Sequence, residues 1–201
     1  MKLRQAGYNL HNLLKMKRTF IGVRVDAGSE LKSAISTLRS GLKNENIKWV
    51  DISNMHVTLA FIGNTEEPMI KRVASVLKND FESFGIINFR LSGFGVFRNF
   101  NDPRIIWTAI ENHKRLIEAH KKVKNGLEAL NIRLEDKQFK PHLTIARIKD
   151  LKDKENLQKL IQKYTNIPFQ DVTISEIVYY ESVLLPSGPL YKPLHIVRLE
   201  K

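Results

Sequence analysis

Two short segments of the chain carry the same arrangement of side chains that can do chemistry. Residues 56–60 (His-Val-Thr-Leu-Ala) and 142–146 (His-Leu-Thr-Ile-Ala) share the pattern His, aliphatic, Thr, aliphatic, Ala. Because side chains alternate between the two faces of a strand, each segment puts its imidazole and its hydroxyl on one face. A single histidine on an apolar strand is usually structural. The repetition of the whole pattern instead favours two matching strands that face each other across a groove.

Paired imidazoles suit general acid–base catalysis at a phosphorus centre. Histidine can take or give a proton near neutral pH, so one ring can accept a proton from water while the other protonates the leaving oxygen. The hydroxyls of Thr58 and Thr144 can donate to phosphate oxygens, and donors aimed at developing charge lower the barrier. This scheme uses no metal ion and no other cofactor. It does not by itself say which of His56 and His142 is the acid.

The segments that must position these residues alternate between strand-like and helix-like patterns. Strands are expected at 17–25, 47–50, 55–62, 86–91, 93–97, 105–110, 139–147, 168–174, 176–184 and 190–199, and helices at 29–42, 65–77, 113–130 and 152–164. Ser29 and Thr65 are expected to cap the first two helices. Glycines at 93 and 95 permit a bulge or a close approach. Because each half holds one His-x-Thr strand, we expect an α+β protein with two antiparallel sheets.

The length and composition fit one domain of two closely joined lobes over residues 16–201, preceded by an N-terminal extension at residues 1–15. Leucines at 10, 13 and 14 are helically spaced, so a short helix in that extension stays open. The chain has no cysteine, which excludes disulfides and thiolate metal sites. It shows no apolar run long enough to cross a bilayer and no apolar core of a signal peptide. We therefore expect a cytoplasmic protein that does not contact membranes.

The chain is strongly basic. It has 33 Lys and Arg residues against 21 Asp and Glu residues, a formal net charge of +12. Such an excess favours a polyanionic partner, and RNA is the first candidate. A lysine-rich surface without any particular partner is the alternative, since lysine is far commoner here than arginine. We expect the protein to be a monomer.

Together with their flanking residues, the two motifs resemble the two-histidine phosphoesterase superfamily and, within it, the RNA 2′,3′-cyclic phosphodiesterase family, first described as 2′-5′ RNA ligases. The resemblance runs from about Met16 to the C-terminus and leaves residues 1–15 outside it. Besides the two His-x-Thr strands, its landmarks are residues 18–22, 49–50, 104–107, 181–182 and 188–191. Their order and spacing agree with the family pattern.

The resemblance implies a bilobal two-histidine phosphoesterase fold, with two antiparallel sheets around a central cleft and helices outside. It also implies hydrolysis of the 2′,3′-cyclic phosphate at an RNA 3′ end to a 2′-phosphate. His56 would be the proton donor and His142 the proton acceptor, and Thr58 and Thr144 would hold the phosphate oxygens. Arg147 matches an arginine that the family is thought to use on phosphate. In an ideal strand, however, it points away from His142 unless a bulge redirects it.

Other functions remain open at this point. The chain could be an RNA- or nucleotide-binding module, although binding alone requires no acid–base pair. It could act on small nucleotides or on 2′-5′ linkages instead of RNA ends, and RNA ligation is the reverse reaction. Metal ligation by the histidines is disfavoured, because neither motif holds a carboxylate or cysteine to complete a coordination shell. Aromatic residues at 97, 180 and 191 could stack on a base, but each is better explained as a residue of the core or of the cleft rim, and none is assigned to the site.

Overall fold

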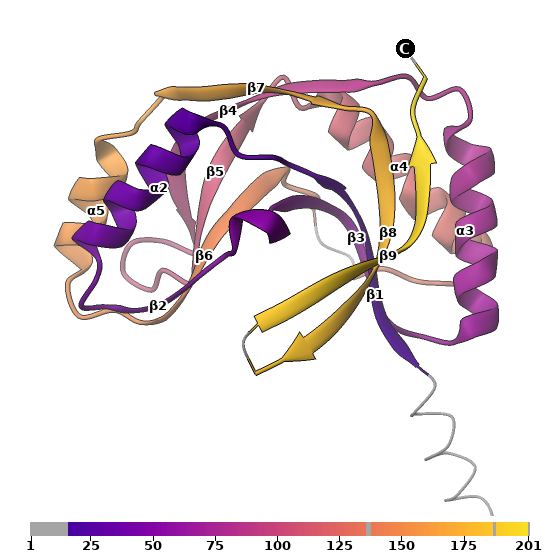
Figure 1. Cartoon of the computed structure of the whole chain (residues 1–201), viewed down its shortest axis with the longest axis horizontal. Helices are drawn as coiled ribbons and strands as arrows, with labels where there is room; N and C mark the ends of the chain where they lie inside the picture. Colours follow the sequence, from indigo (N-terminus) through magenta and orange to yellow (C-terminus); the bar gives the residue numbers. More distant parts are fainter. Residues whose placement is uncertain (1–15, 136–137, 187, 201) are drawn as a thin grey trace, which may run out of the picture.

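A computed structural model describes residues 16–135, 138–186 and 188–200, which form two curved antiparallel sheets (Figure 1). The first sheet has the strand order β3 (His56–Thr65), β1 (Lys17–Arg24), β8 (Glu176–Leu185) and β9 (Gly188–Arg198). The second has the order β2 (Asn46–Trp49), β6 (His142–Asp150), β5 (Ile105–Glu111), β4 (Ile87–Phe97) and β7 (Pro168–Ile174). The expected α+β class with two antiparallel sheets is confirmed. Each sheet holds one of the two His-x-Thr strands.

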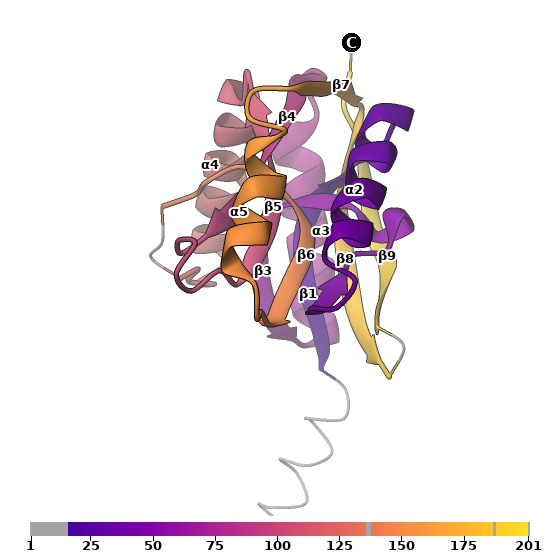
Figure 2. The ribbon, with the colours of Figure 1, turned by 90° about the vertical axis from the view of Figure 1, so that its left-hand side faces the viewer.

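The helices cover the outer faces of the sheets. They are α2 (Ser29–Gly41), α3 (Glu67–Phe81), α4 (Lys114–Ala129) and α5 (Lys154–Gln162), with a 3₁₀ turn η1 (Ile52–Asn54) before β3. Helices α2 and α5 pack together over the second sheet (Figure 2), whereas α3 and α4 pack together over the first. The inner faces are therefore left free to form a cleft. In the described part of the chain, no helix is long and apolar enough to span a membrane.

The two expected helix caps are wrong. Ser29 is the first residue of α2, Gly28 precedes it as the N-cap, and the Ser29 hydroxyl donates to Glu30. Thr65 is the last residue of β3, because its hydroxyl is held by the Thr19 hydroxyl at 2.8 Å and by the carbonyl of Gly63 at 3.0 Å. The local sequence pattern therefore mispredicted both caps. At Thr65 the cause is the hydrogen bond to Thr19, which lies on the neighbouring strand β1.

The two expected strands at 86–91 and 93–97 form one continuous strand, β4. Its pairing with β5 shifts between Ser92 and Phe94, and Gly93 at the shift has a φ of +52°. A positive φ favours glycine, so the expected bulge at this glycine is confirmed. The short helix left open for residues 1–15 lies outside the described residues.

The core lies behind the two His-x-Thr strands, where their aliphatic residues point. Leu143 and Ile145 are fully buried, and Val57 and Leu59 are 1% and 2% exposed. At 25 cal/mol per Å² of apolar surface, burying each of these side chains stabilises the fold by roughly 1.5–3 kcal/mol. The same alternation leaves the histidine and threonine of each strand half-buried on the inner face.

Each His-x-Thr strand contains a bulge at the same place in its motif. The pairing of β3 with β1 skips Leu59, and the pairing of β6 with β5 skips Ile145. In each strand the skipped residue and the following alanine, Ala60 or Ala146, are both buried. Two successive inward residues reverse the alternation, so the next residue returns to the cleft face. That residue is Phe61 in β3 and Arg147 in β6.

Candidate active site

The two histidines make the same hydrogen bond in their two lobes. The Nδ1 of His56 donates to the carbonyl oxygen of Asn54, and the Nδ1 of His142 donates to that of Lys140, each at 2.7 Å. A carbonyl oxygen can only accept, so both Nδ1 atoms carry a proton. The Nε2 atom of each ring is then the one that can exchange a proton with a substrate. The two-residue offset between ring and carbonyl is identical in both motifs.

Aromatic rings fix the plane of each imidazole. Phe20 lies 4.8 Å from the His56 ring, and Tyr191 meets the same ring edge-on at 5.0 Å. Phe97 meets the His142 ring edge-on at 4.6 Å. Two of the aromatic residues considered for base stacking, Phe97 and Tyr191, therefore contact a histidine directly. Packing of this kind leaves the rings little freedom to rotate away from a bound phosphate.

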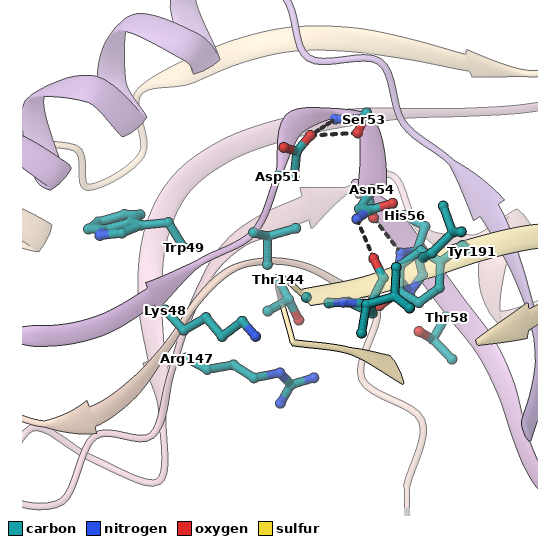
Figure 3. A pocket seen from close by; sticks show the side chains of 15 residues that line it. Lys48, Trp49, Asp51, Ser53, Asn54, His56, Thr58, Thr144, Arg147 and Tyr191 are labelled. Atoms are coloured by element: carbon teal, nitrogen blue, oxygen red, sulfur yellow. Dashed lines mark hydrogen bonds between the residues drawn. The ribbon is translucent and has the colours of Figure 1, made fainter. Parts of the chain in front are cut away.

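A cavity of about 410 Å³ opens between the two lobes (Figure 3). His56 and Thr58 line it from β3, and Thr144 and Arg147 line it from β6. His142 does not line this cavity itself, but it lies on the same strand face as Thr144, and β3 and β6 contact each other. The structure thus brings four of the five sequence-predicted site residues to one cavity and the fifth beside it.

The hydroxyls of Thr58 and Thr144 face the cavity without a hydrogen-bond partner among the residues that the structure describes. Arg147 reaches the cavity because the bulge in β6 turns its side chain back to the face of His142 and Thr144. An ideal strand would have placed Arg147 on the opposite face. The cleft therefore presents two free hydroxyl donors and one guanidinium around the two imidazoles.

Both imidazoles are biased towards their neutral forms. Burial lowers the pKa of His56 below its usual value of 6.5, and the hydrogen bond to the Asn54 carbonyl acts in the opposite direction. The positive charges of Arg147 and His142 lower the pKa of His56 further. Burial also lowers the pKa of His142, with Arg147 adding to the effect. An anion bound between the rings would reverse this bias, because a negative charge stabilises an imidazolium.

A hairpin closes one side of the cavity. The tip of β8 and β9 supplies Leu185, Pro189, Leu190 and Tyr191 to the lining. Asn54 joins the hairpin to the first motif, since its Nδ2 donates to the Pro189 carbonyl at 2.9 Å while its own carbonyl holds His56 (Figure 3). Gly188, at the tip of the same hairpin, also lines the cavity.

Sequence reasoning missed two cationic residues near the cavity. Lys48, on β2, lines it next to Arg147. Arg18, on β1, stacks over the Phe61 ring at 4.8 Å, and its charge lowers the pKa of Tyr191 against the raising effect of burial. The strand Ile47–Val50 was expected, but its pairing with β6 depends on residues a hundred positions away. The sequence therefore showed Lys48 only as a polar residue on a short expected strand, and nothing local indicated that it lines the cavity.

The described residues contain no group of three or more His, Asp or Glu side chains placed to hold a metal ion. Asp51, the one acidic residue lining the cavity among those described, is engaged with its own loop. Its carboxylate accepts from the backbone N–H of Ser53 at 2.8 Å and from the Ser53 hydroxyl, and these bonds lower the pKa of Asp51. The chemistry of the cavity thus rests on imidazole, hydroxyl and cationic groups.

Comparison with known proteins places this arrangement among related chains. The family model of the 2′-5′ RNA ligase superfamily matches residues 27–183. An RNA 2′,3′-cyclic phosphodiesterase of Thermotoga maritima is 34% identical over 91% of this chain and 96% of its own. Proteins of the same name from Methanothermobacter thermautotrophicus and Methanocaldococcus jannaschii are 28% and 32% identical over 90% and 84% of this chain, and over 98% and 94% of their own.

Solved structures share the fold at lower sequence identity. The protein TT0787 of Thermus thermophilus superposes with a TM-score of 0.73 at 24% identity, covering 90% of this chain and 97% of that one. E. coli LigT complexed with 3′-AMP gives a TM-score of 0.69 at 19% identity, covering 92% and 99%. The bilobal arrangement expected from the motifs is that of these structures.

Proposed function

The chain belongs to the 2′-5′ RNA ligase superfamily, and we propose that it is an RNA 2′,3′-cyclic phosphodiesterase whose cleft opens the cyclic phosphate to a 2′-phosphate. The observation that carries this proposal is the matched pair of imidazoles. Each is fixed at Nδ1 by a backbone carbonyl two residues earlier, and each is accompanied by a free threonine hydroxyl. Binding alone would not require two rings held in the same tautomer.

The reaction divides between the two rings. Neutral His142 takes a proton from water at Nε2 while the water oxygen attacks phosphorus. The bond between phosphorus and the 3′ oxygen breaks, and protonated His56 gives its Nε2 proton to that oxygen. The products are a 2′-phosphate and a free 3′ hydroxyl. His142 makes its Nδ1 bond in a more exposed environment than His56, which suits access by water and leaves His56 to protonate the leaving oxygen.

The other groups stabilise the pentavalent transition state. Thr58 and Thr144 donate to its equatorial oxygens, and the Arg147 guanidinium offsets its negative charge. These donors are fixed by strands rather than by loops, so little reorganisation is needed when charge develops. The expected monomeric state, cytoplasmic location and absence of membrane contact remain predictions.

Single substitutions test the assignment. His56→Ala and His142→Ala should each lower kcat for an RNA ending in a 2′,3′-cyclic phosphate by roughly a hundred- to ten-thousand-fold, with the unfolding transition preserved. Thr58→Ala and Thr144→Ala should be milder, because each removes a single donor. The products are identified by ³¹P NMR. Near-normal turnover by either histidine variant would refute the proposal.

A modified leaving group separates acid from base. A cyclic phosphate whose 3′ oxygen is replaced by sulfur needs little protonation to leave, since a thiolate is a far weaker base than an alkoxide. This substrate should restore much of the lost rate to His56→Ala and none to His142→Ala. If the sulfur substrate rescued His142→Ala instead, His142 would be the acid and His56 the base, and the proposed reaction would stay the same.

A further inference from the structure

Two cations stand directly opposite each other on the wall of the cavity. Lys48 on β2 pairs with Arg147 on β6 in the antiparallel ladder, and both side chains line the cavity. Figure 3 shows them extending side by side from neighbouring strands. Like charges at directly opposed positions destabilise a sheet. Neither forms an ion pair or a side-chain hydrogen bond among the residues that the structure describes. Together they present two positive charges that an anionic ligand would neutralise.

The reacting phosphate accounts for Arg147 but not for Lys48. The Arg147 charge lowers the pKa of both histidines, which places it within reach of the reaction centre. Lys48 lies on the neighbouring strand β2, which carries neither histidine. Its Nζ lies instead beside the hairpin, 3.9 Å from where a Cβ on Gly188 would stand. Lys48 therefore supplies a second cationic group, on the side of the cavity that the hairpin closes.

We propose that Lys48 forms a second phosphate subsite, which binds the phosphate on the 5′ oxygen of the same nucleotide that carries the cyclic phosphate. This inference rests on the proposed function. The cyclic phosphate closes the 2′ and 3′ oxygens of a ribose, and the next phosphate along RNA is attached through its 5′ oxygen. A ligand with phosphates at both ends of one sugar matches a cavity with cationic groups at two places.

Lysine is suited to this role. Its ammonium is a compact charge on a flexible stem, which binds a phosphate without the fixed geometry that a guanidinium requires. The carboxylate of Asp51, the one acidic group that lines the cavity in the described part of the chain, accepts hydrogen bonds from Ser53. Lys48 is therefore available to the ligand. A 5′-phosphate can come from the RNA chain itself or from a mononucleotide with a free 5′-monophosphate, and both present the same chemistry.

Three substrates and two variants test the subsite. The substrates are adenosine 2′,3′-cyclic phosphate, the same nucleotide with a 5′-phosphate, and an oligoribonucleotide with a 2′,3′-cyclic end. Lys48→Gln should lower kcat/KM about tenfold for the second and third substrates and leave the first within about twofold. For the oligomer, the slope of log kcat/KM against log salt concentration should also weaken by about 0.7, the loss of one phosphate contact.

Lys149→Gln is the matched control, because it removes the same charge from a neighbouring position on β6 that does not line the cavity. It should leave all three substrates unchanged. A loss with both phosphorylated substrates shows that Lys48 binds the 5′-phosphate in either form. A loss with the oligomer alone identifies the RNA phosphodiester as the ligand, and a loss with the mononucleotide alone identifies a free 5′-monophosphate. An equal loss on all three substrates, no loss on any, or the same loss from Lys149→Gln would overturn the subsite.

A binding measurement keeps this inference separable from the enzymatic proposal. If the wild-type protein hydrolyses none of the substrates, the proposed function fails but the subsite can still be measured. Adenosine 2′,5′-bisphosphate and adenosine 2′-monophosphate are titrated calorimetrically into wild type and Lys48→Gln. The variant should weaken only the bisphosphate, by about tenfold. Equal affinities of the two proteins for the bisphosphate would overturn the subsite independently of catalysis.

Discussion

At the scale of single residues, the cleft is governed by charge around two neutral imidazoles. Burial and the Arg147 guanidinium both act against protonation of His56 and His142. A cyclic phosphodiester carries one negative charge, so its arrival favours protonation of one ring. Under the proposed mechanism, the catalytic acid is therefore protonated mainly when the substrate is present. Substrate binding and the uptake of a proton by one of the two histidines are therefore coupled.

The pH dependence follows from the direction of these shifts. The proposed mechanism requires one protonated and one neutral ring, which gives a bell-shaped curve whose two limbs belong to the pair. Both pKa values are lowered from 6.5, so the optimum of kcat/KM, which reports the free enzyme, should lie below pH 6.5. The optimum of kcat should lie at higher pH, because the bound anion raises the pKa values. A kcat/KM optimum above pH 7 would contradict this interpretation.

Substitution of Arg147 tests the electrostatic coupling. Arg147→Met removes a positive charge that disfavours imidazolium, so both limbs of the kcat/KM profile should move to higher pH. The same variant should lose roughly tenfold or more in rate, since a charged hydrogen bond to phosphate is lost. Arg147→Lys is the control that keeps the charge, and its profile should stay in place. If Arg147→Met and the wild type had identical pH profiles, the Arg147 charge would not affect the pKa values of the two histidines.

At the scale of elements, the two bulges decide what the cleft presents. Each leaves one carbonyl outside the regular ladder, and each carbonyl finds its own donor. The backbone N–H of Val50 donates to Ile145 at 2.9 Å, and the Nδ1 of His120 on α4 donates to Leu59 at 2.8 Å. The His120 ring also stacks on Phe139, close before the second motif. Helix α4 is thereby attached to both His-x-Thr segments.

Removal of His120 should loosen the first motif. His120→Ala leaves the buried Leu59 carbonyl without its donor, and we expect the free energy of unfolding to fall by about 1–3 kcal/mol. Because Thr58 immediately precedes Leu59, kcat should fall several-fold as well. His113→Ala is the matched control: His113 donates to the Ile110 carbonyl at 2.9 Å from an exposed position remote from the cleft. Urea unfolding and initial rates measure both variants, and equal behaviour would remove His120 from the support of the site.

Much of the site could be predicted from sequence because its signals are local. The alternation in both His-x-Thr strands sets the faces of His56, Thr58, His142 and Thr144 without knowledge of any partner strand. The face of Arg147 could not be set this way, since it depends on which residue β5 skips. Lys48 was missed and Thr65 was wrongly expected to cap a helix for the same reason, because the role of each arises from a neighbouring strand distant in sequence.

At the scale of the whole molecule, the chain passes back and forth between the two lobes, so neither lobe is one continuous segment of sequence. Helix α2 follows β1 of the first sheet but packs over the second, and α4 follows β5 of the second sheet but packs over the first. Neither lobe could therefore be cut away without exposing the core of the other. This agrees with the expectation of a single domain over residues 16–201, which stays a prediction.

Deletion of residues 1–15 tests the domain boundary. The described core begins with β1 at Lys17, and all the cleft residues lie after it. The truncated protein should therefore keep its unfolding temperature and its kcat on adenosine 2′,3′-cyclic phosphate within about twofold, the range expected of a distant change. A truncated protein that folds but no longer binds RNA would assign the extension to the site.

The net charge of +12 should act on RNA binding rather than on the chemical step. Each Lys or Arg contact with a phosphate of a single strand releases counterions and contributes a slope of about −0.7 to log K against log salt. A long RNA with a 2′,3′-cyclic end should therefore lose kcat/KM steeply between low and physiological salt. A nucleoside 2′,3′-cyclic phosphate reaches only the cleft and should lose far less, because one phosphate is contacted. If both substrates showed the same slope, the basic surface would not be an RNA track, and recognition would end at the terminal nucleotide.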